Sequence, residues 1–292
     1  MSSYSIRDLE QLSGIKAHTL RIWEQRYNII SPKRTDTNIR LYDDHDLKLV
    51  LNISLLKDHG YKISEISKLS LEEMNNEVVL VSEQKLNYPD QIHSLTISMI
   101  DIDEERFEKV IGKSFLQFGF ENTMVHIIYP FLSRIGTLWV TGSIGPAQEH
   151  FITNLIRQKI IVGIDGQVVK QTVKSRKFIL YLPEGELHEI SLLFANYMIR
   201  ARNHRVIYLG QSLPLAELAF AYNLHKPDYI FTMITTAPSS DDVQTYVNRL
   251  ASEFPSSKIL LTGYQVVGQD IETASNVVII NKIDDLLEEI SD

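Results

Sequence analysis

The chain has 292 residues, of which 44% are hydrophobic and 23% are charged, and its formal net charge is -8 at pH 7. This length predicts two or three domains with sizeable cores, and the absence of cysteine excludes disulfides, thiol catalysis and cysteine-metal sites. Since no apolar run approaches the ~18 residues that span a bilayer and no basic-then-apolar leader is present, we expect a cytoplasmic protein without a membrane partner.

The charge is unevenly distributed along the chain. Residues 1–42 hold seven Lys or Arg against four acidic residues, a net of +3, so the remaining 250 residues carry -11. A basic N-terminal segment on an acidic body can approach a polyanion such as DNA while the body stays away from it.

Two short helices joined around a glycine are predicted at the N-terminus. Ile6, Leu9 and Leu12 recur at helical spacing, and Gly14 ends this helix where a turn needs a permissive backbone. The second helix follows, with polar or cationic side chains at Lys16, His18, Thr19, Arg21 and Arg26. This is the helix-turn-helix plan, whose second helix enters a major groove; a helical packing module with a solvated basic face is the alternative.

A basic extended segment and two further helices complete the N-terminal region. Pro32, Lys33, Arg34 and Arg40 suit a segment that lies along phosphates, and helices are expected over 43–56 and from residue 61. Residues 70–90 show no clean hydrophobic period and end at a proline. We therefore divide the chain into an N-terminal domain, a linker, a helical domain and a C-terminal domain at 1–75, 76–90, 91–170 and 175–292.

The N-terminal region closely resembles the DNA-binding domain of the MerR family. The resemblance rests on the run TLRIWEQRY, the triplet at 32–34 and the segment at 38–42, and it is greatest to the LitR and CarH branch. It implies a transcriptional repressor whose winged helix-turn-helix reads double-stranded promoter DNA, with the wing built from 32–42. The DNA-binding residues that it implies are Lys16, His18, Thr19, Arg21, Arg26, Lys33, Arg34, Arg40 and Tyr42. Because one recognition helix spans few base pairs, we expect a homo-oligomer, a dimer or a tetramer, on a symmetric site.

The middle of the chain predicts a small helical bundle. Apolar residues recur at helical spacing and indicate four helices, at 91–101, 103–118, 121–139 and 145–169. Pro130 interrupts the third of these helices, where we expect a kink.

From Lys177 onward, short apolar strands alternate with helices. Strands are expected at 178–182, 205–210, 229–234, 258–262 and 277–280. This alternation predicts a doubly wound parallel sheet of the Rossmann-like kind, so the fold class is multidomain α and α/β. Ligands of such sheets bind at the carboxyl ends of the strands, which directs attention to the loops at 183–188, 210–214, 235–240 and 263–268.

The C-terminal half resembles the cobalamin-binding module of the LitR and CarH branch. In that module a Trp and a Glu-His pair cover the upper face of the corrin, and Trp139 with Glu149 and His150 matches this spacing. The lower axial ligand of the cobalt is matched by His188, and its hydrogen-bonding partner by Glu186. The resemblance therefore implies adenosylcobalamin as the cofactor, with His188 as its metal ligand.

Four positions depart from that family's pattern. Ser191 replaces a glycine beside which the nucleotide tail of the corrinoid passes, and Met233 replaces a small Ser of the tail pocket. Thr262 replaces the first of two paired glycines, the second being Gly263. These added side-chain atoms predict a narrowed tail channel. Val140 replaces the histidine that traps cobalt after illumination in light sensors of this type, so we do not expect that form of light switching. Cobalamin binding and a degenerate site without cofactor are both left open.

No motif in the chain predicts catalysis. There is no Walker phosphate loop, no His-Glu-x-x-His and no G-x-S-x-G, and too few residues remain for the catalytic barrel of a cobalamin-dependent mutase. A second function stays open, in which the helix-turn-helix is mainly a scaffold for a ligand- or protein-sensing interaction module. A gel shift against promoter DNA, compared with a pull-down from lysate, distinguishes the two.

Overall fold

The computed structural model describes the backbone of residues 3–35, 37–84, 87–140, 143–168, 170, 172–236 and 242–291. The side chains at 79, 82–84, 137 and 140 lie outside this description. The chain divides into two compact units, Met1–Asn154 and Leu155–Asp292.

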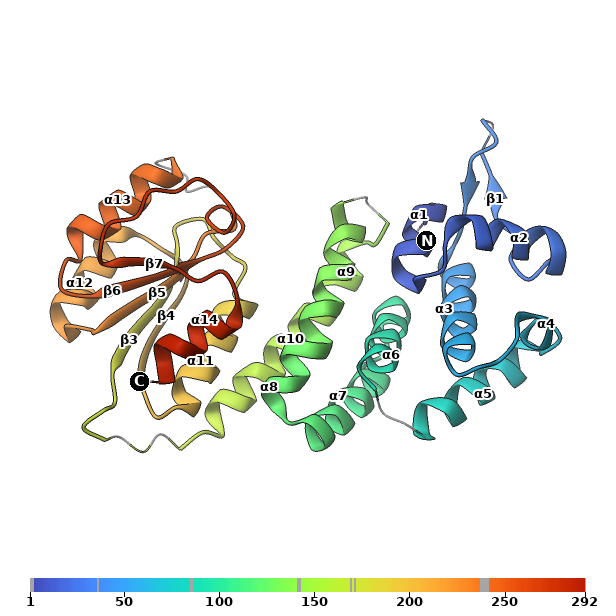
Figure 1. Cartoon of the computed structure of the whole chain (residues 1–292), viewed down its shortest axis with the longest axis horizontal. Helices are drawn as coiled ribbons and strands as arrows, with labels where there is room; N and C mark the ends of the chain where they lie inside the picture. Colours follow the sequence, from blue (N-terminus) through green and yellow to red (C-terminus); the bar gives the residue numbers. More distant parts are fainter. Residues whose placement is uncertain are drawn as a thin grey trace. The chain divides into compact units, whose positions relative to one another are not determined.

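The N-terminal unit begins with the expected helix-turn-helix (Figure 1). Its helices are α1 (Ile6–Ser13), α2 (Ala17–Tyr27), α3 (Asp44–Asp58) and α4 (Ile63–Ile66). Ser5 and Asp8 form a capping box that satisfies the first amides of α1. Gly14 ends this helix with φ at 72°, a left-handed conformation that favours glycine.

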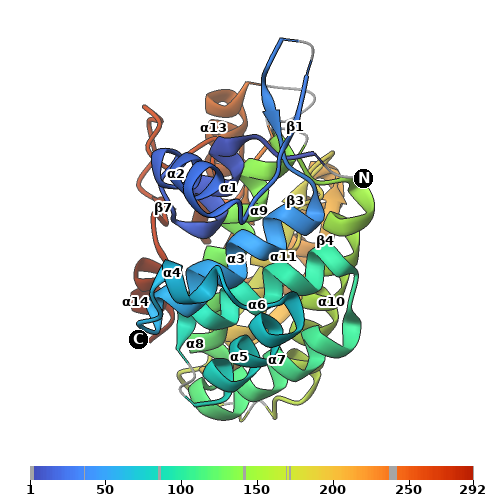
Figure 2. The same cartoon turned by 90° about the vertical axis from the view of Figure 1, so that its right-hand side faces the viewer.

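A two-stranded hairpin follows α2 and projects beyond α1 and α2 (Figure 2). Its strands, β1 (Lys33–Arg34) and β2 (Arg40–Leu41), pair antiparallel. The backbones of Tyr4 and Tyr42 exchange hydrogen bonds of 2.8 and 2.9 Å, which attach the base of the hairpin to the segment before α1. The predicted wing is therefore present.

The rest of this unit is helical. Its elements are α5 (Leu71–Gln84), α6 (Tyr88–Asp101), α7 (Glu104–Phe118), α8 (Phe120–Thr123), the π-helix η1 (Met124–Ile128), α9 (Tyr129–Val140) and the first half of α10 (Pro146–Asp165). The predicted linker at 76–90 is helical as far as Gln84. Met74, Val78 and Val81 recur at helical spacing on α5, and Met74 and Val81 are buried where this helix packs against α3.

Pro130 is accommodated by a wider turn rather than by a break. The amide of Tyr129 donates to Met124 O, five residues earlier, and η1 passes directly into α9. Proline has no amide hydrogen to donate and clashes with the preceding turn, so a local π-turn relieves both problems.

The second compact unit begins inside α10, at Leu155. Arg157 of α10 donates from Nε to Glu189 Oε2 at 2.7 Å, and Gln167 donates to Tyr197 O at 3.1 Å. These contacts attach the second half of α10 to the α/β unit.

The C-terminal unit is the predicted doubly wound sheet. Its elements are β3 (Lys177–Pro183), α11 (Ile190–Ala201), β4 (Arg205–Leu213), α12 (Leu215–His225), β5 (Tyr229–Met233), α13 (Val243–Glu253), β6 (Lys258–Thr262), β7 (Val277–Ile279) and α14 (Ile283–Ser291). All strands are parallel, in the order β4-β3-β5-β6-β7. The strand order reverses between β3 and β5, and ligands of this fold class bind at such a switch point.

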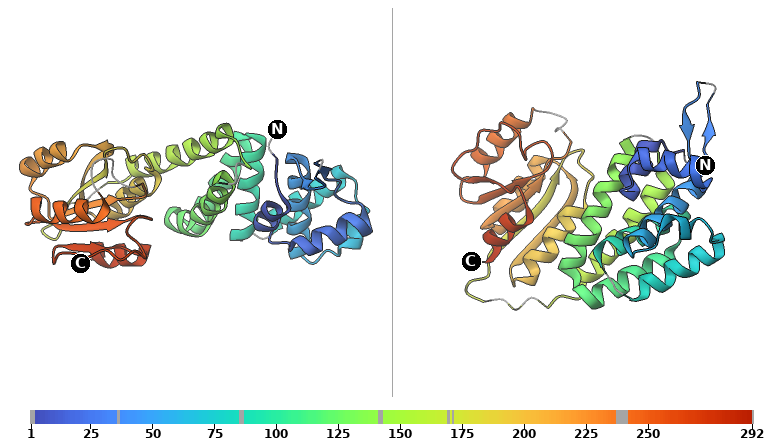
Figure 3. Two further views of the ribbon diagram at one scale, coloured as in Figure 1. Left: turned by 90° about the horizontal axis from the view of Figure 1, so that it is seen from above. Right: turned by 45° about the vertical axis from the view of Figure 1, so that its right-hand side comes forward.

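Helices cover both faces of this sheet. Helices α11 and α14 lie on one face, and α12 and α13 lie on the other (Figures 1 and 3). The α12 and α13 face holds a core in which Tyr181, Leu218 and Val247 are buried, and the Tyr181 hydroxyl lies 2.9 Å from that of Tyr246. Among the described residues, no helix is long and apolar enough to cross a membrane.

Candidate functional site

Helix α2 has a packing face and an exposed face. Leu20 and Trp23 are buried, at 1% and 3% exposure, and hold the helix against the rest of the head. The predicted DNA-binding side chains lie elsewhere on α2: His18, Arg21 and Arg26 are exposed, Thr19 is half-buried, and Lys16 stands exposed at the N-cap. Lys16 forms an ion pair with Glu10 of α1 at 2.9 Å. Four cations or potential cations are thus presented around one helix, as a DNA-reading helix requires.

Glu24 of α2 joins the recognition helix to both strands of the wing. Its Oε1 accepts from Arg34 Nη2 at 3.1 Å, and its Oε2 accepts from Arg40 Nε at 2.7 Å. The carboxylate side chain is only 15% exposed, so these bonds lie in a partly desolvated site where they are stronger than on an open surface. Sequence reasoning missed Glu24, although its place between two basic segments was the available signal.

The predicted wing residues divide into exposed and buried groups. Lys33 and Arg34 are exposed, and Lys33 lies 3.7 Å from Asp43. Tyr42 is only 2% exposed, and burial raises the pKa of its hydroxyl to about 12. The prediction that Tyr42 contacts DNA is therefore not retained, because its side chain packs in the core beneath the wing.

The carboxyl ends of β3 and β5 carry a polar cluster at the switch point. Glu186, in the loop after β3, accepts from the amides of Thr235 and Thr236 at 2.9 and 2.8 Å, and from the Thr235 hydroxyl at 2.5 Å. Its other oxygen lies 2.5 Å from His188 Nδ1. A carboxylate from one loop is therefore bonded to the loop of the neighbouring strand and to the imidazole.

This arrangement keeps Glu186 charged and orients His188. Burial opposes ionisation of Glu186, which is 2% exposed, but its hydrogen bonds from Thr235, His188 and Thr236 prevail and lower its pKa to about 2. Because a carboxylate only accepts, His188 carries its hydrogen on Nδ1, and Nε2 keeps a lone pair. The His188 side chain is 71% exposed, so that lone pair is accessible to a ligand.

The predicted residues along the tail path lie in the same unit. Ser191 is half-buried in the first turn of α11, and Met233 is buried at 8% exposure at the end of β5. The Thr262 hydroxyl donates to Ile280 O at 2.7 Å.

Gly263 is required by the sheet itself. Its φ is +110°, and a Cβ there would lie 2.4 Å from Ile234 O. This glycine allows the chain after β6 to pass against the chain after β5, which is a structural reason independent of any cofactor.

The predicted upper-face residues lie in the N-terminal unit. Trp139, on α9, is 43% exposed, which is unusual for so large an apolar side chain. On α10, His150 Nδ1 lies 2.9 Å from Glu149 Oε2, and the His150 side chain is 70% exposed. The side chain of Val140, the fourth departure from the family pattern, lies outside the described residues.

Comparisons with known proteins identify relatives of both parts of the chain. Residues 4–73 match the MerR HTH family of regulatory proteins, and residues 91–162 match a B12 binding domain. The HTH-type transcriptional repressor CarH of Myxococcus xanthus is 25% identical over 259 residues, which cover 87% of this chain and 86% of that protein. CarA, a second repressor of that organism, is 23% identical over 255 residues, covering 86% and 84%. MlrA of Escherichia coli, a transcriptional regulator, is 35% identical over 69 residues, covering 24% and 28%.

The chain is therefore a transcriptional regulator that joins a MerR helix-turn-helix to a B12-binding domain. It is homologous to the CarH and CarA repressors, so the resemblance found in the sequence is confirmed.

Proposed function

We propose that this regulator is a repressor that binds promoter DNA as a homo-oligomer and holds cobalamin through His188. The observation that carries the cobalamin part is the hydrogen-bonded series Thr235, Glu186 and His188, which leaves an accessible nitrogen at a ligand-binding edge of the sheet. As a protein that acts on promoter DNA, it would work in the cytoplasm.

Promoter binding is assigned to α2 and the wing. Arg21 and Arg26 are exposed on α2, and Lys33 and Arg34 are exposed on the wing. Lys16, His18 and Thr19 complete the proposed DNA-contacting set, and Arg40 supports the wing through Glu24. Cations on both elements can meet phosphates on either side of a groove read by α2.

The donor set at His188 fits a corrinoid cobalt. A neutral imidazole is a suitable nitrogen ligand, and a carboxylate on its other nitrogen fixes the tautomer and the orientation of the ring. Cobalamin, when bound, would supply a cobalt centre that such a nitrogen can ligate. Glu186 orients the ring, and Thr235 and Thr236 hold Glu186 charged.

We propose that the affinity for cobalamin is lowered along the tail path. Ser191, Met233 and Thr262 each carry side-chain atoms where the family pattern has smaller residues, and overpacking a tight site typically costs ~1–3 kcal/mol. Two such costs would weaken binding by orders of magnitude, at about 1.4 kcal/mol per tenfold.

Trp139, Glu149 and His150 are proposed for the upper face, and Val140 leaves no second imidazole for a light-driven trap. We assign no catalytic reaction to the chain.

The test is a dark titration of the purified protein with adenosylcobalamin, followed by absorption spectroscopy and gel filtration. We expect a weak coloured complex that is lost in His188→Ala and retained in His225→Ala, a matched change at the end of α12. A protein that stays colourless at high cofactor concentration would exclude the cobalamin part. If His188→Ala binds adenosylcobalamin as tightly as the wild type does, His188 is excluded as the cobalt ligand.

A further inference from the structure

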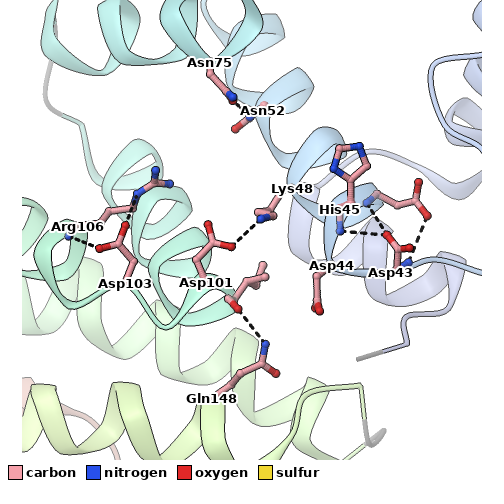
Figure 4. A network of polar contacts seen from close by, with 12 residues as sticks. Asp43, Asp44, His45, Lys48, Asn52, Asn75, Asp101, Asp103, Arg106 and Gln148 are labelled. Carbon is pink, nitrogen blue, oxygen red and sulfur yellow. Dashed lines mark hydrogen bonds and ion pairs between the residues drawn. The ribbon is translucent and has the colours of Figure 1, made fainter. Parts of the chain in front are cut away.

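The N-terminal unit contains a cavity that is separate from both sites described above. Its volume is about 690 Å³, within the range of small-molecule sites, and it lies between α3 and α5 on one side and α6 and α7 on the other. Figure 4 shows part of its polar lining, including Lys48, Asn52, Asp101 and Arg106. Neither the DNA-binding set nor the His188 cluster contributes to it.

One wall of the cavity is apolar. It is formed by Leu49 of α3, Val78 of α5, Ile97 of α6 and Val110 of α7. Burial of the hydrocarbon part of a ligand against such a wall is favourable, because it removes apolar surface from water.

Cationic side chains outnumber acidic ones on the α7 side of the cavity, which Asp103 and Glu105 also line. Arg106, Lys109 and Lys113 all line it, and their spacing along α7 places them on one face of the helix. Four cationic and three acidic side chains line the cavity, so the lining has one positive charge in excess. The whole chain, by contrast, has a net charge of -8. Two of the lining cations pair with lining acids: Lys48 with Asp101 at 2.6 Å, and Arg106 with Asp103 at 3.5 Å.

Two buried polar atoms in the lining side chains lack a hydrogen-bond partner among the described residues. They are Asn52 Oδ1 and His93 Nε2, on side chains of residues only 9% and 8% exposed. The Asn52 amide nitrogen donates to Asn75 at 3.1 Å, so its oxygen is left as an acceptor. Burial, with the nearby charges of Arg106 and Arg134, lowers the pKa of His93 to about 3, so its ring is neutral. An unpaired buried polar atom is destabilising, and a ligand can remove this cost by supplying the hydrogen-bond partner.

We propose that this cavity binds a small organic anion that has an apolar body and an N–H or O–H donor. The anionic group lies against Arg106, Lys109 and Lys113, the apolar body against the Leu49 and Ile97 wall, and the donor meets Asn52 Oδ1. Because α3 belongs to the DNA-binding head and α7 to the bundle, the ligand contacts both.

The probe for the test is 1-anilinonaphthalene-8-sulfonate, which has an anionic group, an aromatic body and one N–H. N-phenyl-1-naphthylamine is its matched control, because it keeps the body and the N–H but lacks the sulfonate. Each is titrated into the full-length protein, and binding is followed by fluorescence. We expect saturable binding with one site, and an affinity for the uncharged control lower by about tenfold.

Three variants locate the site. The double change Lys109→Gln and Lys113→Gln should weaken the anionic probe by about tenfold while leaving the uncharged control unchanged. Ser94→Trp, which fills the cavity from a half-buried lining position, should abolish binding of both. The double change Lys62→Gln and Lys68→Gln removes two exposed lysines outside the cavity and should change neither. Thermal melting and a promoter gel shift confirm that each variant is folded.

Two outcomes would overturn the proposal. One is that a folded Ser94→Trp variant binds the anionic probe as the wild type does. The other is that the Lys109 and Lys113 variant affects both probes equally. Should Ser94→Trp fail to fold, carbon-13 methyl spectra of the wild type decide the matter: probe-dependent shifts of Leu49, Ile97 and Val110 are required.

Discussion

Arg34 and Arg40 share one carboxylate, but their side chains differ in exposure. The Arg34 side chain is 42% exposed, and its Nη1 also donates to Asn38 Oδ1 at 2.8 Å. The Arg40 side chain is 22% exposed and donates directly to Glu24 from Nε. Arg34 is therefore the wing arginine that can reach a phosphate, whereas Arg40 mainly holds the wing in place.

Arg34→Ala is expected to weaken DNA binding about threefold to tenfold for every sequence tested. A phosphate contact carries no base information, so the salt dependence should also lose about one unit of slope. Fluorescence anisotropy over a range of salt concentrations measures both quantities, with Lys68→Ala as the control. A loss confined to a single operator sequence would instead indicate a base contact.

Glu186 links stability to pH. Its pKa in the folded protein is about 2, below the ordinary value of 4.5, so its contribution is present above about pH 4.5 and is lost as pH falls through 2. The shift corresponds to an upper limit of about 3 kcal/mol. Glu186→Gln should therefore be less stable than the wild type at pH 7, and the difference should shrink toward pH 2.

Urea unfolding at a series of pH values measures this difference. Glu184→Gln, at an exposed neighbouring position, is the control and should follow the wild type throughout. A difference between Glu186→Gln and the wild type that stays constant from pH 7 to pH 2 would show that the charge of Glu186 does not stabilise the fold.

At the scale of elements, Glu24 fixes the wing on the recognition helix. Glu24→Gln removes a negative charge near DNA, which by electrostatics alone should tighten binding. We expect the opposite, a loss of about threefold to tenfold, because the wing loses its anchor to α2. Operator binding by anisotropy gives the sign directly, and Glu72→Gln on α5 serves as the control. Tighter binding by Glu24→Gln would rule out the positioning role.

The close passage of the chain after β6 against the chain after β5 gives a second prediction at this scale. Gly263→Ala combines positive φ with a clash against Ile234, so we expect a loss of more than about 3 kcal/mol in the free energy of unfolding. Gly268→Ala also has positive φ, at +72°, but meets no atom within 4 Å, and should cost about 1 kcal/mol. Chemical denaturation measures the free energy of unfolding of both variants. Equal losses would show that the structure relieves the clash between the Gly263→Ala side chain and Ile234.

At the scale of the whole molecule, the proposed oligomer requires two heads on one operator. Half-sites read by symmetric heads must lie on a common face of the duplex. Inserting about five base pairs between the half-sites turns one of them to the opposite face and should reduce affinity by at least about tenfold. A gel shift with inserts of five and about ten base pairs tests this, since the longer insert restores the common face. Binding unaffected by either insert would mean that one head suffices.

The sequence by itself determined the elements and the family. Strands β3 to β7 were predicted to within three residues, because short apolar runs between polar loops have few alternatives to a buried parallel sheet. The family motifs likewise located the helix-turn-helix, the wing and the Glu186 and His188 pair. Local signals sufficed there, since capping, periodicity and motif spacing act over a few residues.

Only the tertiary structure decided which distant groups meet. Thr235 and Thr236 reach Glu186 across about fifty positions, at separations of 49 and 50 residues, because β3 and β5 are neighbours in the sheet. Tyr42 became a core residue where its backbone, just after β2, bridges to Tyr4. The partners of Glu24, the packing of α5 and the cavity beside α7 also depend on contacts between elements. Such contacts are selected by burial and shape in three dimensions, which no local pattern of residues specifies.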